Sequence, residues 1–150
     1  RKIEPNVSTT RERFEVLKQL RDAGIPTVVW LCPILPFIND TKENIEGILD
    51  YCIEAKVYGV LCFGMGLTLR EGNREYFYQQ LDLLFPSLKE TYVQKYGDSY
   101  GIDSPNGPEL MRLFHETCEQ NGIVHDNKQI FAYLNTFEEK RRDRQMSLFE

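Results

Sequence analysis

Two cysteine side chains stand at the ends of short apolar runs, where a thiol could take part in chemistry. The first run, "TVVWLC" (27–32), ends at Cys32, and the second, "YGVLCF" (58–63), carries Cys62 next to its end. Both runs are short, apolar and partly β-branched, which is typical of strands buried in a parallel sheet. A thiol where such a strand ends can face a ligand, but buried cysteines also serve as small hydrophobic residues. Both interpretations stay open on the residues alone.

Each run is followed by a loop that is longer than a plain connection requires. These loops are "PILPFIND" (33–40) and "GMGLTLREGN" (64–73). In α/β folds, functional groups gather where strands lead into such loops, at the carboxyl edge of the sheet. Pro33 and Pro36 would stiffen the first loop and hold its backbone open for a flat ligand. The alternative is a plain turn that covers the end of a sheet or barrel, with Asp40 as the N-cap of the next helix.

Helical patterns surround both runs. Thr9 and Glu12 have capping-box spacing and predict a helix that reaches Ala23. Asp40 and Glu43 form a second such pair, and an amphipathic helix is predicted to follow them. The apolar positions of that helix are Ile45, Ile48, Leu49, Cys52 and Ile53. The alternation of helices and strands predicts an α/β fold with a parallel sheet or barrel.

The rest of the chain is predicted to be helical. Asn73 would cap a helix that ends before Pro86, and three more helices would follow, over 87–96, from Pro108 to Gly122, and over 130–137. The Gly-, Ser-, Asp- and Pro-rich residues 97–107 predict a linker. The predicted division is therefore an α/β part (1–96), the linker (97–107) and a helical extension with a flexible tail (108–150). Because the chain starts with a helix that no strand precedes, we expect it to be a piece of a longer protein.

Charge, hydropathy and cysteine spacing argue against several classes of protein. A net charge of −5 gives the chain as a whole no electrostatic footprint for nucleic acid. No apolar stretch approaches the ~20 residues that a membrane-spanning helix requires, and no signal-peptide pattern is present. The four cysteines, at spacings of 20, 10 and 56, match neither a zinc knuckle nor a disulfide framework. We therefore expect reduced thiols in a cytoplasmic protein without a membrane span.

Other polar groups carry weaker signals. Arg70, Glu71 and Arg74 could bind a substrate anion, although a solvated loop fits them better. His115 and Cys118 share a helix face, but with no obvious third ligand, core packing or a surface histidine is the simpler interpretation, and no metal ligand is predicted. Asp126 or Asn127 is more plausible as a helix cap than as a catalyst.

A longer pattern resembles a known family. "IEPNVSTTRERFEVLKQLRDAGIP" (3–26) followed by "PILPFIND" (33–40) is similar to the later half of the radical S-adenosylmethionine (radical SAM) domain in spore photoproduct lyase-like proteins. The matching residues are Glu4, Pro5, Ser8, Arg11 or Arg13, Ala23 to Pro26, Pro33, Ile34, Pro36, Asn39 and Asp40. The resemblance covers about residues 2–64 and continues more loosely through "CFGMGLTLREGNREYFYQQLD". It implies that the two runs are the fifth and sixth strands of a partial (β/α)6 TIM-type barrel, followed by a helical C-terminal extension.

The resemblance also implies a site. The full-length parent would be a radical SAM enzyme, lyase-like and related to DNA repair. Pro33 and Ile34 would face the adenine of S-adenosylmethionine, while Asn39 and the backbone from Phe63 to Met65 would hydrogen-bond its nucleoside.

Cys32 and Cys62 would face the substrate, where a thiol can donate a hydrogen atom. The family's chemistry needs three cysteines spaced C-x-x-x-C-x-x-C, whose thiolates bind a [4Fe–4S] cluster. This sequence has no such triplet. We therefore expect S-adenosylmethionine and the cluster in the parent only, neither of them bound to this chain, and we expect the chain alone to be inactive.

Three partners are predicted. The missing N-terminal half of the barrel is the first, and a second copy of this chain is another, because two parallel strands leave two open edges and an apolar face. The third is a bacterial sliding clamp, whose docking peptide resembles Gln145, Met146, Ser147, Leu148 and Phe149. The alternative function is a non-enzymatic helical interaction module with this clamp-binding-like tail.

Overall fold

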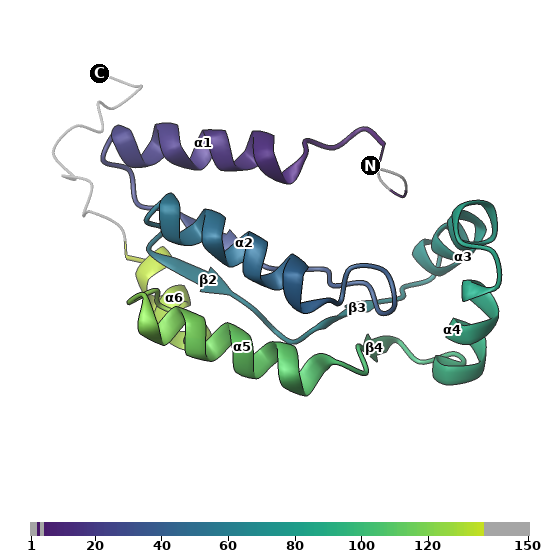
Figure 1. The fold of residues 1–150 in the computed structure, drawn as a ribbon. Helices are drawn as coiled ribbons and strands as arrows, with labels where there is room; N and C mark the ends of the chain where they lie inside the picture. The colour runs from purple at the N-terminus through teal and green to yellow at the C-terminus, as the bar shows by residue number, and fades with distance from the viewer. Residues whose placement is uncertain (1–2, 4, 137–150) are drawn as a thin grey trace, which may run out of the picture.

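The computed structural model describes residue 3 and residues 5–136, which form six helices and four short strands (Figure 1). The helices are α1 (Thr10–Asp22), α2 (Lys42–Glu54), α3 (Asn73–Leu84), α4 (Leu88–Tyr96), α5 (Gly107–Gln120) and α6 (Asn127–Leu134). The strands are β1 (Val28–Trp30), β2 (Gly59–Leu61), β3 (Gly66–Thr68) and β4 (Gly101–Asp103). The predicted α/β class is confirmed. In this described part, no helix combines the length and the apolar composition needed to cross a membrane.

β1 and β2 form a parallel sheet in which Val28 is paired with Gly59 and Trp30 with Leu61. A third parallel segment lies on the other side of β2, where Val124 forms a bridge with Gly59. Two backbone hydrogen bonds hold this segment, from the Val60 N–H to the Val124 carbonyl (2.9 Å) and from the Val124 N–H to the Tyr58 carbonyl (3.1 Å). The prediction of two open edges is therefore wrong for β2, while β1 is an edge strand of the described sheet.

The first hydrophobic core joins the sheet to α1, α2 and α5, which lie side by side in Figure 1. Its buried members are Phe14, Leu31, Ile34, Ile45, Leu49, Cys52, Ala55, Val57, Val60, Cys62, Met65, Leu110, Phe114, Cys118 and Ile123. On the opposite face of the sheet, α6 packs against β2, and Gly59 makes room because a Cβ there would lie 3.1 Å from Ile130 Cδ1. The sheet is thus covered completely on one face and in part on the other.

Helix caps follow the sequence with two exceptions. The capping box of Thr9 and Glu12 is confirmed, and the Asp126 carboxylate caps α6 by accepting a hydrogen bond from the Gln129 N–H (2.7 Å). The predicted cap of α2 is wrong, because Thr41 is its N-cap and accepts from the Asn44 N–H (3.3 Å). Asn73 is also no cap: it is the first residue of α3, and no side chain caps that helix.

A second core is built by residues inserted between β2 and α5. Antiparallel strands β3 and β4 pair here and carry α3 and α4 between them, at the right-hand end of Figure 1. The buried members are Leu69, Phe77, Leu81, Tyr92 and Ile102. The predicted loop 64–73 therefore contains β3, and the predicted linker 97–107 contains β4. Gly66 permits the close pairing, because a Cβ there would collide with the Ile102 carbonyl oxygen.

The loop 33–40 ties the two cores together. The Ile34 N–H donates to the Gly66 carbonyl (3.0 Å), and the buried Tyr92 hydroxyl donates to the Pro36 carbonyl (2.6 Å). Within the loop, the Asn39 side-chain oxygen accepts a hydrogen bond from the Leu35 N–H (2.6 Å). Each of these bonds satisfies a polar group that the prolines and the surrounding apolar side chains would otherwise leave without a partner.

Asp40, at the end of this loop, is buried with 2% of its surface exposed. Its carboxylate accepts a hydrogen bond from the Ser104 hydroxyl (2.5 Å), and its carbonyl accepts one from the Asn106 side-chain amide (3.0 Å). The Ser104 hydroxyl oxygen also accepts from the Asn106 N–H (2.9 Å). These bonds fasten the first loop to the turn that begins α5.

Replacing Ser104 by alanine is expected to lower the free energy of unfolding by about 1–3 kcal/mol, because the buried Asp40 carboxylate loses its hydroxyl donor. Urea unfolding followed by circular dichroism measures the change. Ser99→Ala is the matched control, since the Ser99 side chain is exposed. Equal stability of the two variants would contradict the importance of the Asp40–Ser104 bond.

Candidate functional site

The candidate site is the carboxyl edge of the parallel sheet. Because β1 and β2 are parallel, the residues that follow them, Cys32 and Pro33 on one strand and Cys62 and Phe63 on the other, leave the sheet at the same edge. The side chains of Cys32, Pro33 and Phe63 are exposed. This edge therefore offers a thiol, a proline ring and an aromatic ring to the surroundings.

An aromatic cluster of Trp30, Phe63 and Phe131 continues this edge onto one face of the sheet. Ring centroids lie 5.7 Å apart for Trp30 and Phe63, 6.5 Å for Trp30 and Phe131, and 6.3 Å for Phe63 and Phe131. Val29 and Leu31 pack into the first core, so the alternation of side chains directs Trp30 to the opposite face. Trp30 and Phe63 are 56% and 62% exposed, which is unusual for large rings on a parallel sheet.

The structure separates the residues that the sequence predicted to contact a nucleoside. Ile34 and Met65 are each only 2% exposed and belong to the first core. The Asn39 side-chain oxygen is bonded within its own loop, and the Met65 carbonyl accepts a hydrogen bond from the Ser104 N–H (2.7 Å). Of the five predicted cofactor contacts, Pro33 and Phe63 have exposed side chains at the edge.

The two candidate thiols face different surroundings. Cys32 is exposed, and partial burial raises its pKa while a hydrogen bond from the Trp30 side chain opposes that rise. Cys62 is buried, with its Sγ atom 3.7 Å from Met111 Sδ in the first core, and burial raises its pKa. Cys32 is therefore the thiol that a substrate at this edge would meet first.

The remaining predicted polar groups have structural partners. The Arg74 guanidinium donates to the carbonyls of Leu69 (3.2 Å), Asp98 (3.0 Å) and Ser99 (2.9 Å), which leaves little of it for a substrate anion. Arg70 donates to the Tyr100 hydroxyl (3.0 Å). Among the described residues, no three histidine, cysteine, aspartate or glutamate side chains already form a group that could hold a metal ion.

Asn127 is a polar residue at this edge that sequence reasoning assigned only to helix capping. Its side-chain amide donates to the Cys62 carbonyl (2.9 Å), while its buried side-chain oxygen has no hydrogen-bond partner in the structure. Asn127 reaches β2 because the segment through Val124 runs beside that strand. Sequence periodicity could not reveal this pairing, since the segment forms a single bridge and is no regular strand.

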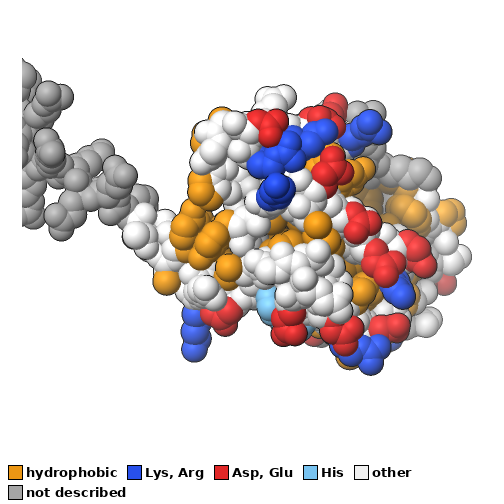
Figure 2. All heavy atoms as spheres, turned by 60° about the vertical axis from the view of Figure 1, so that its left-hand side comes forward, with side chains coloured by type: hydrophobic (Ala, Val, Ile, Leu, Met, Phe, Trp, Pro, Cys, Tyr) orange, Lys and Arg blue, Asp and Glu red, His pale blue; other side chains and the backbone are white. Residues whose placement is uncertain are grey.

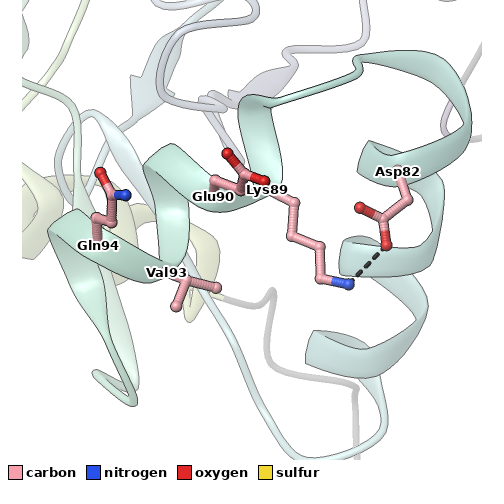
Figure 3. A pocket seen from close by; sticks show the side chains of 5 residues that line it. All are labelled: Asp82, Lys89, Glu90, Val93 and Gln94. Atoms are coloured by element: carbon pink, nitrogen blue, oxygen red, sulfur yellow. Dashed lines mark hydrogen bonds and ion pairs between the residues drawn. The ribbon is translucent and has the colours of Figure 1, made fainter.

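A shallow hollow of about 290 Å³ lies away from this edge, on α3 and α4 (Figure 3). Asp82, Lys89, Glu90, Val93 and Gln94 line it. Lys89 and Asp82 form an ion pair with an N–O distance of 2.6 Å, which bridges the two helices. Because its one cation, Lys89, is already paired with Asp82, the hollow offers little to an anionic ligand.

Comparison with known proteins finds distant relatives. The chain is 30% identical over 96 residues to uncharacterized proteins of Mycobacterium bovis and Mycobacterium tuberculosis. The match covers 64% of this chain and 28% of each relative, so the chain corresponds to less than a third of the curated proteins it matches. No family model matches the chain. No solved structure matches it.

Thiol chemistry tests the placement of the four cysteines. Cys32 is expected to react with a disulfide reagent far faster than the others, because burial raises the pKa of Cys52 to about 12 and that of Cys118 to about 11. The Cys32 rate should keep rising with pH beyond the range of an ordinary cysteine, since its raised pKa delays formation of the reactive thiolate. Cys32→Ser should remove the fast phase, and Cys118→Ser should leave it. A fast phase that survives Cys32→Ser would contradict this placement.

Proposed function

We propose that this chain is the C-terminal part of a radical SAM enzyme that resembles spore photoproduct lyase-like proteins, and that it forms one wall of that enzyme's site. The observation that carries the proposal is the exposed group of Trp30, Cys32 and Phe63 at the carboxyl edge of a parallel sheet. In a TIM-type barrel, the face of each strand that points away from the helices lines the interior. The relation to DNA repair, and the location in the cytoplasm, belong to the same proposal.

The architecture supports a barrel in two ways. The order β1, α2, β2, α5 and the segment at Val124 gives three parallel segments joined by two helices, which is the repeat unit of a barrel. β1 is an edge strand of the described sheet, where a preceding strand could pair, and its Trp30 ring is exposed on the face opposite the first core. The insertion from β3 to β4 and helix α6 would be additions to this repeat.

Of the two cofactors of a radical SAM enzyme, the residues of this chain suit only the nucleoside part of S-adenosylmethionine. A [4Fe–4S] cluster does not fit, because the sequence has no C-x-x-x-C-x-x-C and no group of described residues could hold a metal. For a nucleoside, the exposed Pro33 and Phe63 provide apolar contact surfaces, whereas Ile34, Met65 and Asn39 are already used in packing and loop structure. This chain's part would be to bind and orient a ligand and to present the Cys32 thiol.

A helical interaction module is the second candidate function. The insertion exposes apolar side chains on α3 and α4, namely Leu83 (73% exposed) and Val93 (47% exposed). Such side chains on neighbouring helices are typical of a surface that a protein partner covers. The clamp-binding-like peptide from Gln145 to Phe149 lies outside the described residues, so docking on a sliding clamp remains a proposal from sequence.

The enzyme proposal is tested with the longer protein that the proposal requires. After anaerobic reconstitution with iron and sulfide, the longer protein should gain a [4Fe–4S] chromophore and, with a reductant, release 5′-deoxyadenosine from S-adenosylmethionine. The present chain, treated in the same way, should stay colourless. A longer protein without a C-x-x-x-C-x-x-C sequence, or without the chromophore, would overturn the proposal.

Self-association separates the two candidate functions. The sheet face that carries Trp30 would be covered by the rest of the barrel in the enzyme proposal. If that face is the exposed apolar surface, the chain should associate with itself at micromolar concentration, and Trp30→Lys should make it monomeric. If the insertion is the docking surface, Leu83→Lys should have that effect instead. Sedimentation velocity of the three proteins measures the outcome. A wild-type chain that remains monomeric throughout would contradict a homo-oligomer formed by either surface.

A further inference from the structure

The sequence contains two Asn-Gly pairs, Asn106-Gly107 and Asn121-Gly122, which lie at opposite ends of α5. Asn106 is the N-cap of the helix, and Asn121 is its C-cap. In an Asn-Gly pair the backbone nitrogen of glycine can approach the asparagine side-chain amide easily, because glycine has no side chain that hinders the approach or restricts the backbone. Both pairs therefore have the same intrinsic reactivity, and the surrounding structure decides how readily each can react.

The backbone at the two asparagines is nearly the same and does not distinguish the pairs. The φ and ψ angles are −85° and 0° at Asn106, and −105° and 6° at Asn121. Both asparagines are also exposed. The difference lies in the glycines, because Gly107 is buried, whereas Gly122 is exposed and has open space where a Cβ would be. The residue that supplies the attacking nitrogen is thus accessible in the second pair.

Hydrogen bonds hold the first pair to a distant part of the fold. The Asn106 side-chain amide donates to the Asp40 carbonyl (3.0 Å), and the Asn106 N–H donates to the Ser104 hydroxyl oxygen (2.9 Å). The Gly107 N–H donates to the Ser104 carbonyl (2.9 Å). Ser104 is bonded in turn to the buried Asp40 carboxylate. Freeing this pair therefore requires the contact between the loop 33–40 and the start of α5 to open.

Hydrogen bonds of the second pair go to the last turn of α5. The Asn121 side-chain amide donates to the Thr117 carbonyl (2.8 Å), which also accepts from the Asn121 N–H (3.2 Å). The Gly122 N–H donates to the Glu119 carbonyl at 3.3 Å. All three bonds break together when the last turn frays, and fraying of a helix end costs far less free energy than opening a core.

We propose that Asn121 is a site of spontaneous deamidation in the folded protein and that the fold protects Asn106. The Gly122 nitrogen loses its proton to solvent and forms a bond to Asn121 Cγ, while the Cγ–Nδ2 bond breaks and the amide nitrogen leaves as ammonia. Water then opens the resulting succinimide at either of its two carbonyls. The products are aspartate and isoaspartate, in which the main chain runs through the former side chain. Nothing is oxidised or reduced in these steps.

Deamidation at Asn121 disturbs both the sheet and the helix. Ile123 is buried in the first core and Val124 pairs with β2, so the extra main-chain methylene of isoaspartate displaces the segment that covers this edge of β2. A new carboxylate is also unfavourable at the C-terminus of a helix, and the last turn of α5 contains no basic residue. The end of α5 lies at the left of Figure 1, the side that turns toward the viewer in Figure 2, where acidic side chains already gather beside a histidine.

Incubation of the folded chain at mildly alkaline pH tests the proposal, because peptide mass spectrometry measures aspartate and isoaspartate at both sites in one sample. We expect Asn121 to deamidate faster than Asn106 by about 10-fold or more, since a helix end opens more often than a contact between two cores. In urea, where both pairs are unfolded, the two rates should become similar.

Two variants complete the test. Asn121→Gln keeps the amide but requires a larger and slower-forming ring, so it should suppress the product at this site and leave the rate at Asn106 unchanged. Asn121→Asp carries the new charge without the extra methylene, and the isoaspartate form should melt at a lower temperature than this variant. An isoaspartate form that melts together with Asn121→Asp would overturn the effect on the sheet.

Three results would overturn the site itself. They are equal rates at the two asparagines of the folded chain, a faster rate at Asn106, and an unmodified Asn121 in the folded chain over a period in which the unfolded chain deamidates.

Discussion

The hydrogen bond from Ser104 to the buried Asp40 carboxylate is the contact on which the arrangement of this chain depends. A buried carboxylate is costly unless it is hydrogen-bonded, so the loop 33–40 and the turn before α5 must stay together. Together with the bond from the Ile34 N–H to the Gly66 carbonyl, this contact fastens both ends of the insertion, from β3 to β4, to the loop 33–40. With both ends fixed, the second core can pack beside the first while β1 and β2 keep their common carboxyl edge.

The polar groups of the loop 33–40 serve the packing of the two cores in the same way as Asp40 does. Most of its polar groups bond to the loop itself or to the insertion, as the Asn39 oxygen and the Pro36 carbonyl do. The loop is therefore chiefly a structural joint between the two cores. At the carboxyl edge of the parallel sheet, the side chains available to a ligand are therefore those that remain exposed beside this loop, namely Cys32, Pro33 and Phe63. A ligand site built in this way would have a rigid floor, which favours precise positioning.

Much of the parallel part of the fold could be predicted from the sequence. The buried runs around Val29 and Val60 and the amphipathic pattern of α2 are strong local signals, and their order implies a parallel sheet. Strands β3 and β4 could not be found in this way, because neither lies in a continuous apolar run like those around Val29 and Val60: β3 is Gly-Leu-Thr and β4 is Gly-Ile-Asp. The sequence predicts Asp40 as a cap because a carboxylate before a helix usually caps it, whereas its actual partner, Ser104, is 64 residues away. The exposure of Trp30 depends on which elements cover the sheet, and local patterns carry no such information.

Hydrogen–deuterium exchange of β1 shows whether this sheet is the open side of a barrel. Leu31 bonds toward β2 through its N–H, so the alternate amides of Val28 and Trp30 point to the outer edge. These two amides should exchange rapidly in the present chain. In the longer protein that the proposal requires, a preceding strand should protect them by about 100-fold or more, comparable with core amides. Equally rapid exchange in both proteins would show that no strand pairs with β1, and would contradict the barrel.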